Sequence, residues 1–503
     1  MKRHAHNIRQ PYSLLPFILF FFAACFLVTL LLTIKEGVFF SGDAGLKFLM
    51  VKQIAGGGSY TTLNLEAPLW VSKIWSRGFY PFKAPFVYDS PQGKVISFPP
   101  AFQWLTSCLY KYAGFKGIYI VPFLSLTAMW LWFIFFMKKT GVKPLVISVA
   151  FILLAFCSPL TIYGALYWEH SLSILLSFSA IVFLLLKRVS DFYAVLSGLM
   201  TGMSVWLRPE MLLLCLLLVM IILFNNLKEK NKANIIFIAS LLTGVLAYLI
   251  FNSLVYGIIL GQHSVQLSAP EGFKKYLMDK MIILFHLNGR LLLYFPLTGL
   301  FYGIIFYLSG KRITLPLIVR QLTVIITLFL LIAPLALPNA GGKQWGPRYF
   351  LNVIPVIIML SVVVMEHGLI KFNKWLLLIL IPVAAYSMYL NVYLARRTLK
   401  RDYAYRVKPG LDFLKKQSCD VLVVQNQFIA QEYAVLFDTK KIFLAEDQQS
   451  FNMLMKLLQD EGITKIIFMS HDAGFKRLPE NLISGNSILK KIGDYYFAEY
   501  DIK

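Results

Sequence analysis

Long apolar segments recur along this chain of 503 residues, and they constrain its fold more than any other feature. About 18 to 20 consecutive apolar residues span the hydrocarbon core of a bilayer, and many windows of the sequence reach that length. Hydrophobic residues make up 58% of the chain, which is more apolar surface than a soluble domain can bury. We therefore predict a mainly α, polytopic transmembrane helical bundle of about 11–13 helices.

Basic residues between the apolar segments set the predicted topology. Five clusters are each separated from the next by two apolar segments, so they share one side of the membrane, and the positive-inside rule assigns that side to the cytoplasm. These clusters are Lys138-Lys139 with Lys143, Lys187-Arg188, Lys228 to Lys232, Lys311-Arg312, and Lys371 with Lys374. The basic amino terminus precedes an uncleaved first helix at about 14–34 and is also predicted to be cytoplasmic. Parity then requires that the short apolar segment 98–112 does not cross the membrane.

Net charge and small motifs narrow the class of protein further. The net charge of +24 is explained by cytoplasmic loops, so no nucleic-acid partner is predicted. The five cysteines form neither a disulfide framework nor a metal-binding spacing. The chain contains no Asn-x-Ser/Thr sequon, which favours a bacterial plasma membrane over a secretory pathway. We predict a multi-pass protein of a bacterial inner membrane that contacts membrane lipid.

The sequence divides into two predicted domains. Residues 1–394 form the transmembrane domain, which includes a large first outer loop at 35–97. Residues 395–503 contain short apolar runs separated by helical patterns, and this β-α-β-α-β order predicts a small C-terminal α/β domain. By parity this domain is predicted to lie outside. It shows no glycine-rich phosphate-binding motif, and its role is not evident from sequence.

Two acids at predicted outer positions are candidate catalytic residues. Asp43 follows the first helix between Gly42 and Gly45, where a glycine-flanked backbone could approach a ligand closely and the carboxylate could act as a general base. The alternative is a solvated loop acid or a helix N-cap. Glu169, in Trp168-Glu169-His170, could orient an acceptor or bind a metal. It could instead be a first-turn acid that the helix dipole stabilises. His170 is the weaker candidate for a functional role.

Cations and aromatic residues at the predicted outer face form candidate binding groups. Lys343, Trp345, Arg348 and Tyr349 lie together at a helix entrance, where Arg348 could hold a phosphate or the group could instead be interfacial anchors. Arg208 could reach a phosphate or pair with Glu210 across Pro209. Three further positions complete the set: Lys94, as a further donor-phosphate ligand, and His263 and Arg290, as cationic lining.

The order of these motifs resembles the GT-C superfamily of integral membrane glycosyltransferases, and more narrowly the protein O-mannosyltransferases and lipid A aminoarabinose transferases. The resemblance covers about residues 10–395. The residues that carry it are Gly42-Asp43, Ser97 to Leu105 with Pro99-Pro100, Gly198-Leu199 to Arg208-Pro209-Glu210, and Gly346-Pro347-Arg348-Tyr349 to Pro355. The chain departs from the family's usual acidic pair, because Ala44 follows Asp43.

The resemblance implies a sugar donor on a polyprenyl phosphate and a single inverting displacement at the outer face. Asp43 would accept the proton of an acceptor hydroxyl, Arg348, Lys343 and Arg208 would neutralise the leaving phosphate, and Glu169 would orient the acceptor. The acceptor could be a glycan, a lipid or a protein. The sequence indicates no cofactor, although a divalent cation is compatible with the site. The alternatives are a transporter or flippase, or a ligase or polymerase, of lipid-linked saccharides.

Overall fold

The chain folds as two compact units in the computed structural model. The structure describes residues 14–187, 190–229, 231–266, 273–337, 339–366, 374–471, 483–484 and 489–502. Unit 1 comprises residues up to 30 together with 121–251 and 267–396, and unit 2 comprises 31–120, 252–266 and 397–503. The basic residues at 1–13, Arg188, Lys230 and Lys371 lie outside the described residues, so the orientation that they predict stays a prediction.

Unit 1 is a bundle of apolar helices, and it makes the chain a multi-pass membrane protein. Among the described residues, five helical stretches are long and apolar enough to cross a membrane: 120–139, 232–256, 317–336, 348–366 and 376–416. The pair 275–294 and 297–310 is bent by 97° and would count as a sixth. Four shorter apolar helices accompany them, and the segment 101–117 is in neither group; whether it crosses stays a prediction.

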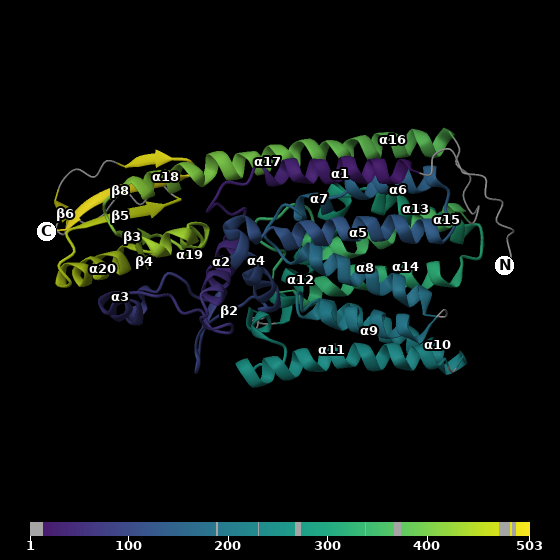
Figure 1. Ribbon diagram of the computed structural model, residues 1–503, viewed down its shortest axis with the longest axis horizontal. Helices are drawn as coiled ribbons and strands as arrows, with labels where there is room; N and C mark the ends of the chain where they lie inside the picture. Colours follow the sequence, from purple (N-terminus) through teal and green to yellow (C-terminus); the bar gives the residue numbers. More distant parts are fainter. Residues whose placement is uncertain are drawn as a thin grey trace. The chain divides into compact units, whose positions relative to one another are not determined.

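The helices of unit 1 pack pairwise along their lengths. Within the unit, α8 packs along α9, α10 against α14, and α15 against α6 (Figure 1). The bounds are α1 Leu15–Leu31, α5 Ile120–Lys139, α6 Pro144–Ala155, α7 Leu160–Tyr163, α8 His170–Leu186, α9 Asp191–Val205, α10 Met211–Glu229, α11 Lys232–Tyr256, α12 Phe273–Tyr294, α13 Leu297–Gly310, α14 Leu317–Ile332, η3 Ala333–Ala336, η4 Arg348–Val353, α15 Ile354–Glu366, α16 Lys374–Met388 and η5 Tyr389–Leu394.

Glycines bring α9 and α11 into close contact. A Cβ atom on Gly198 would lie 2.4 Å from the carbonyl oxygen of Phe237, and one on Gly202 would lie 3.0 Å from the Cα of Gly244. Small residues at helix interfaces allow such close backbone approach, which is the main source of packing energy between helices in lipid. Gly198 therefore serves helix packing here, and α9 leads directly into the Arg208 turn.

Unit 2 contains the predicted C-terminal sheet. Apolar runs such as Val421–Val424, in which every residue is buried, form its central strands. The strand order is β4-β3-β5-β8-β6, with β7 paired to β8; β3 pairs in parallel with β4 and β5, and β8 is antiparallel to β5. The bounds are β3 Val421–Val424, β4 Lys441–Leu444, β5 Lys465–Ser470, β6 Ile483–Ser484, β7 Lys490–Ile492 and β8 Tyr495–Ile502. The β-α-β-α-β order predicted from sequence is present as β3, β4 and β5 with the helices between them.

The first outer loop folds together with this sheet. Val71, Ile74 and Phe79 from the loop share one buried core with Val423 and Phe443 from the sheet. The remaining elements of unit 2 are α2 Gly42–Ala55, α3 Leu69–Ile74, η1 Trp75–Phe79, β1 Val87–Ser90, β2 Gly93–Ile96, α4 Ala101–Gly117, η2 Gln262–Gln266, α17 Ala395–Arg401, η6 Asp402–Arg406, α18 Lys408–Lys416, α19 Gln427–Glu432, η7 Ala434–Asp438 and α20 Gln448–Asp460. In Figure 1 the loop elements are purple and the sheet is yellow-green.

Candidate active site

The turn between α9 and α10 holds a buried arginine. Pro209 and Glu210 follow Arg208 directly, and the amide of Met211 donates to the Arg208 carbonyl oxygen at 2.9 Å, which closes the turn. The Arg208 side chain is 7% exposed, and its Nε donates to Glu210 Oε1 at 2.5 Å. The pairing expected as the structural alternative is therefore present. Pro209 and Glu210 precede the first residue of α10, and an acid beside a helix amino end is favourable.

Glu169 and His170 approach the same guanidinium from α8. Glu169 is the N-cap residue of α8, and its carboxylate lies 3.6 Å from Arg208 Nη1. His170, which is 2% exposed, hydrogen-bonds Arg208 through Nε2. Two carboxylates and an imidazole thus surround one arginine. Because the guanidinium occupies the space between the carboxylates, this arrangement fixes its position rather than forming an open metal site.

A second arginine lies near the same tyrosine ring as Arg208. The guanidinium carbon of Arg208 is 5.2 Å from the centroid of the Tyr349 ring, and that of Arg348 is 5.1 Å from the same centroid. Arg348 also donates to the Tyr349 hydroxyl at 3.2 Å and lies over the Trp168 ring at 5.7 Å. Cation–π contacts of this kind hold guanidinium groups in place while their N–H groups stay able to donate.

Aromatic residues that the sequence reading did not select build the wall of this cluster. Tyr163 and Trp168 stack near His170, with ring centroids 5.0 Å and 5.2 Å away. Burial raises the pKa of Tyr163, while the positive charges of Arg348, Arg208 and Arg290 act to lower it. The positive charges of three guanidinium groups therefore act on one region of unit 1. Ordinary aromatic residues in an apolar sequence give no signal that would have identified this wall.

Asn352 ties the elements of the cluster together. Its buried amide donates to the hydroxyls of Ser173 and Ser177 on α8, at 3.0 Å and 3.1 Å, and it also contacts the sulfur of Met211 at the start of α10. A buried amide in an apolar bundle costs free energy unless it is hydrogen-bonded, so these contacts specify one arrangement. They hold η4, which carries Arg348 and Tyr349, against the helices that carry His170 and follow Arg208.

The loop before η4 contributes Lys343 and Trp345. Lys343 is exposed, whereas Trp345 is buried and donates from Nε1 to Asn391 Oδ1 at 3.2 Å. The Trp345 carbonyl accepts from the Tyr163 hydroxyl at 2.7 Å, and its ring packs edge-on against Tyr294 at 5.3 Å. Trp345 is thus part of the scaffold under the cluster, and Lys343 is the more accessible of the two.

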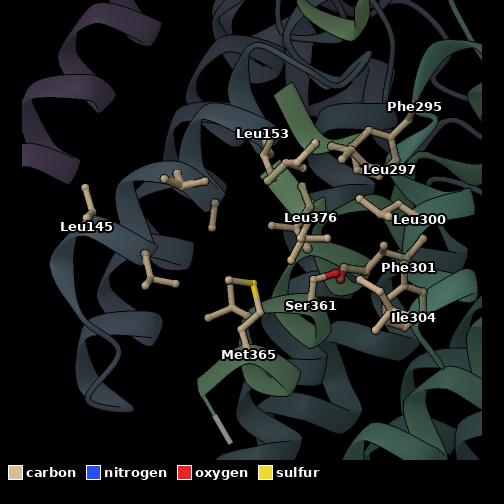
Figure 2. A pocket seen from close by; sticks show the side chains of 17 residues that line it. Leu145, Leu153, Phe295, Leu297, Leu300, Phe301, Ile304, Ser361, Met365 and Leu376 are labelled. Atoms are coloured by element: carbon tan, nitrogen blue, oxygen red, sulfur yellow. Dashed lines mark hydrogen bonds between the residues drawn. The ribbon is translucent and has the colours of Figure 1, made fainter. Parts of the chain in front are cut away.

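An apolar groove of about 430 Å³ lies in unit 1 between α6, α13, α15 and α16. Figure 2 shows its walls, from Leu145 on one side to Phe295 and Phe301 on the other. Apart from Ser361, every lining residue is apolar. The Ser361 hydroxyl donates a hydrogen bond to the Ile357 carbonyl oxygen at 2.8 Å. Such a groove accommodates hydrocarbon rather than a polar group.

Asp43 belongs to unit 2, where it is the second residue of α2. It is half-buried and is not the N-cap, a position that Ser41 occupies. The expectation that Gly42 and Gly45 let the backbone approach a ligand is not what the structure shows. A Cβ on Gly45 would lie 1.7 Å from the Gln431 carbonyl oxygen, so these glycines let α2 dock against α19 of the C-terminal sheet domain.

Lys94 and His263 also belong to unit 2. Lys94 lies on the β1–β2 hairpin, pairs with Asp89 at 2.5 Å and sits 4.8 Å above the Tyr80 ring. His263 is half-buried in η2. Within unit 1, by contrast, the structure brings together Glu169, His170, Arg208, Glu210, Arg348 and Tyr349. Over the described residues no group of three His, Cys, Asp or Glu side chains is arranged to hold a metal ion.

No protein-family model matches this chain, and no curated protein matches its sequence. Solved structures do resemble it. ArnT from Cupriavidus metallidurans bound to undecaprenyl phosphate matches with a TM-score of 0.60 at 12% identity, over 96% of this chain and 97% of that chain. The apo state of the same protein matches with a TM-score of 0.59 over the same shares. The chain therefore shares the fold of this protein over nearly its whole length, as the resemblance in its motifs predicted.

Proposed function

We propose that this chain is a membrane glycosyltransferase that moves a sugar from a polyprenyl-phosphate donor to an acceptor hydroxyl. The single observation that carries the proposal is the pair of arginines that both lie close to the Tyr349 ring in unit 1. Guanidinium groups bind phosphate oxygens bidentately, and a leaving phosphate gains negative charge as the glycosidic bond breaks. The proposed reaction takes place at the outer, periplasmic face of a bacterial plasma membrane.

The two arginines have different proposed roles. Arg208 is already engaged by Glu169 and Glu210, so it would hold the site in shape and add positive field. Arg348, supported by the aromatic faces of Tyr349 and Trp168, would contact the donor phosphate, with Lys343 as a second cation. Trp345 and His170 would help to hold these phosphate-binding residues in position. Glu169 would orient the acceptor, as the family resemblance implies.

The apolar groove is the proposed site for the polyprenyl chain. Phe295 lines the groove, and its neighbour Tyr294 packs against Trp345, three residues from Arg348. A lipid whose phosphate is held at Arg348 can therefore continue along protein surface into the groove shown in Figure 2. ArnT, whose structure was solved with undecaprenyl phosphate, has the same fold, which supports a donor of this class.

Asp43 is the proposed general base, on the strength of the sequence resemblance. In an inverting displacement the acceptor oxygen attacks the anomeric carbon, the bond from that carbon to the phosphate oxygen breaks, and polyprenyl phosphate leaves. The proton of the acceptor hydroxyl passes to the Asp43 carboxylate. The membrane supplies proximity, because it confines the lipid donor to the surface at which the site opens.

The first experiment measures donor use by Arg348→Lys. Transfer of radiolabelled sugar from a polyprenyl-phosphate donor in membranes is expected to fall roughly 10- to 100-fold, because a point charge replaces a planar fork. The matched control is Arg320→Lys, an exposed arginine at the start of α14, which should transfer at the wild-type rate. Equal rates for both variants would contradict the role of the arginine cluster.

A second experiment tests the base. Asp43→Asn keeps the size of the side chain and removes its charge, so transfer should fall by roughly 100-fold or more while donor binding is retained. Asp420→Asn, at an exposed position in the same unit, is the matched control. Unchanged transfer in a folded Asp43→Asn protein would move the role of base to another acid, with Glu169 and Asp89 the next to substitute.

A transporter of lipid-linked saccharides is the second candidate. One observation favours it: α12 and α13 form a bent pair at 97°, and broken helices are typical of transporters. Absence of transfer by the wild-type protein from every polyprenyl-phosphate sugar supplied would favour this alternative over the glycosyltransferase.

A further inference from the structure

A polar cleft of about 780 Å³ lies in unit 2, and none of its lining residues belongs to the arginine cluster of unit 1. Its walls come from the α3–η1 segment, the β1–β2 hairpin and the strand end at Leu444. This volume falls within the range of roughly 300–1,000 Å³ that is usual for small-molecule sites. Unlike the groove in unit 1, the cleft combines aromatic rings with hydroxyl, ammonium and carboxylate groups.

The aromatic wall of the cleft is held rigidly. Trp75 and Tyr80 meet edge to face, with ring centroids 5.3 Å apart, and Tyr80 meets Phe82 in the same way at 6.0 Å. The Trp75 indole donates to the Ile442 carbonyl oxygen at 3.0 Å, which fixes the ring against the terminal sheet. Rings that are already ordered lose little conformational entropy when a ligand packs against them.

Tyr80 carries a polar group that the described part of the protein does not satisfy. Its side chain is 9% exposed, and its hydroxyl has no hydrogen-bond partner among the described residues. Burial, with a smaller contribution from Asp89, raises the pKa of the phenol, so the hydroxyl stays neutral and can donate. A buried hydroxyl without a partner carries a free-energy cost that a ligand oxygen in the cleft would remove.

The charges at the cleft compensate one another. Lys94 pairs with Asp89 at 2.5 Å, and Lys83 pairs with Glu446. A phosphate would have to break these pairs to gain a net cationic partner. A ligand that offers neutral hydroxyl groups can instead accept from Lys94 and donate to Asp89, whose side chain is 83% exposed, while both pairs stay in place.

We propose that this cleft is a saccharide-binding site that takes a pyranose unit of a glycan. A pyranose presents an apolar C–H face and a rim of hydroxyl groups, which match the half-buried ring of Trp75 and the polar set of Asp89, Lys94 and Tyr80. The cleft shares no residue with the arginine cluster, so the proposal stands whether or not that cluster transfers a sugar.

The test measures binding of simple sugars to the full-length protein in detergent. Saturation-transfer difference NMR is recorded with methyl glycosides of glucose, mannose, galactose and N-acetylglucosamine. At least one is expected to bind, with its strongest signals from the C–H protons of one ring face. Tyr80→Phe should weaken that binding about fivefold or more, since it removes one hydrogen bond, and Asp89→Asn should weaken it as well.

The controls separate binding from folding. The Tyr80 hydroxyl has no hydrogen-bond partner in the described part of the chain, so Tyr80→Phe should leave the melting temperature unchanged or slightly raised. Tyr112→Phe, at a residue that is 87% exposed outside the cleft, should bind like the wild type. Three outcomes would overturn the proposal. They are no signal from any glycoside, equal binding of glycosides by Tyr80→Phe and the wild type, or binding at the cleft by an unglycosylated peptide and by no glycoside.

Discussion

Gly45 offers the sharpest test of how unit 2 holds Asp43. In Gly45→Ala the added Cβ would lie 1.7 Å from the Gln431 carbonyl oxygen, whereas real Cβ atoms essentially never approach within 3.0 Å of another heavy atom. The difference of 1.3 Å must be absorbed by movement. The atom in the way belongs to the backbone of α19 and cannot rotate aside, so α2 itself has to shift away from α19.

Two magnitudes follow from that displacement. Overpacking of this kind costs roughly 1–3 kcal/mol, which corresponds to a loss of about 2–10 °C in melting temperature for a unit of this size. Asp43 lies two residues before Gly45 in the same first turn, and a misplacement of about 1 Å can cost roughly 100-fold in rate. Sugar transfer should therefore fall about 100-fold, while donor binding at the arginine cluster stays near wild type.

The assay compares purified Gly45→Ala and Gly56→Ala proteins in detergent by thermal unfolding and by transfer of radiolabelled sugar. Gly56 is at the other end of α2, where an added Cβ would lie an ordinary 3.5 Å from its nearest neighbour and the backbone has a φ of −80°. Gly56→Ala should therefore behave like the wild type. If Gly45→Ala matches it in both melting temperature and transfer, then the docking of α2 on α19 does not control Asp43.

Two further substitutions test the packing of the separate units. Asn352→Ala removes an amide that bonds Ser173 and Ser177, so unit 1 should lose roughly 2–3 kcal/mol, seen as a lower melting temperature in detergent, whereas Ser361→Ala should have little effect. In unit 2, Arg406→Met leaves buried Glu432 without the guanidinium that contacts it at 2.6 Å, and should cost roughly 3–5 kcal/mol. Lys52→Ala breaks only an exposed pair with Asp438 and should cost less than about 1 kcal/mol. Similar melting temperatures for Arg406→Met and Lys52→Ala would refute the assigned burial.

The sequence predicted the helices and strands of this fold better than it predicted which of them pack together. The strands at 421–424 and 441–444 could be recognised because each is a short apolar run between polar segments, and such runs depend on local pattern alone. That the first outer loop shares a core with these strands could not be recognised. Val71 and Phe443 pack in the same buried core, and the identity of a hydrophobic residue does not indicate which distant residue will pack against it.

The candidate site was predictable to a similar degree. Arg208, Glu210, Arg348 and Tyr349 were identifiable because charged residues at the ends of membrane helices are expensive and call for an explanation. Their arrangement around one phenol ring was not, because it depends on how η4 packs against α8 through Asn352. Tyr163 and Trp168 were missed, since aromatic residues are common throughout this chain.

The docking of α2 against the terminal domain also sets an order of events during synthesis. Lys52 and Asp438, which pair in the finished protein, are 386 residues apart in the chain. At roughly 5–20 residues per second, a ribosome needs about 20–80 s to travel between them. The segment that carries Asp43 is thus made early and must wait for the last quarter of the chain before it can settle. A nascent protein interrupted between Tyr349 and Asp438 carries the residues of its arginine cluster but cannot complete the fold around its proposed base.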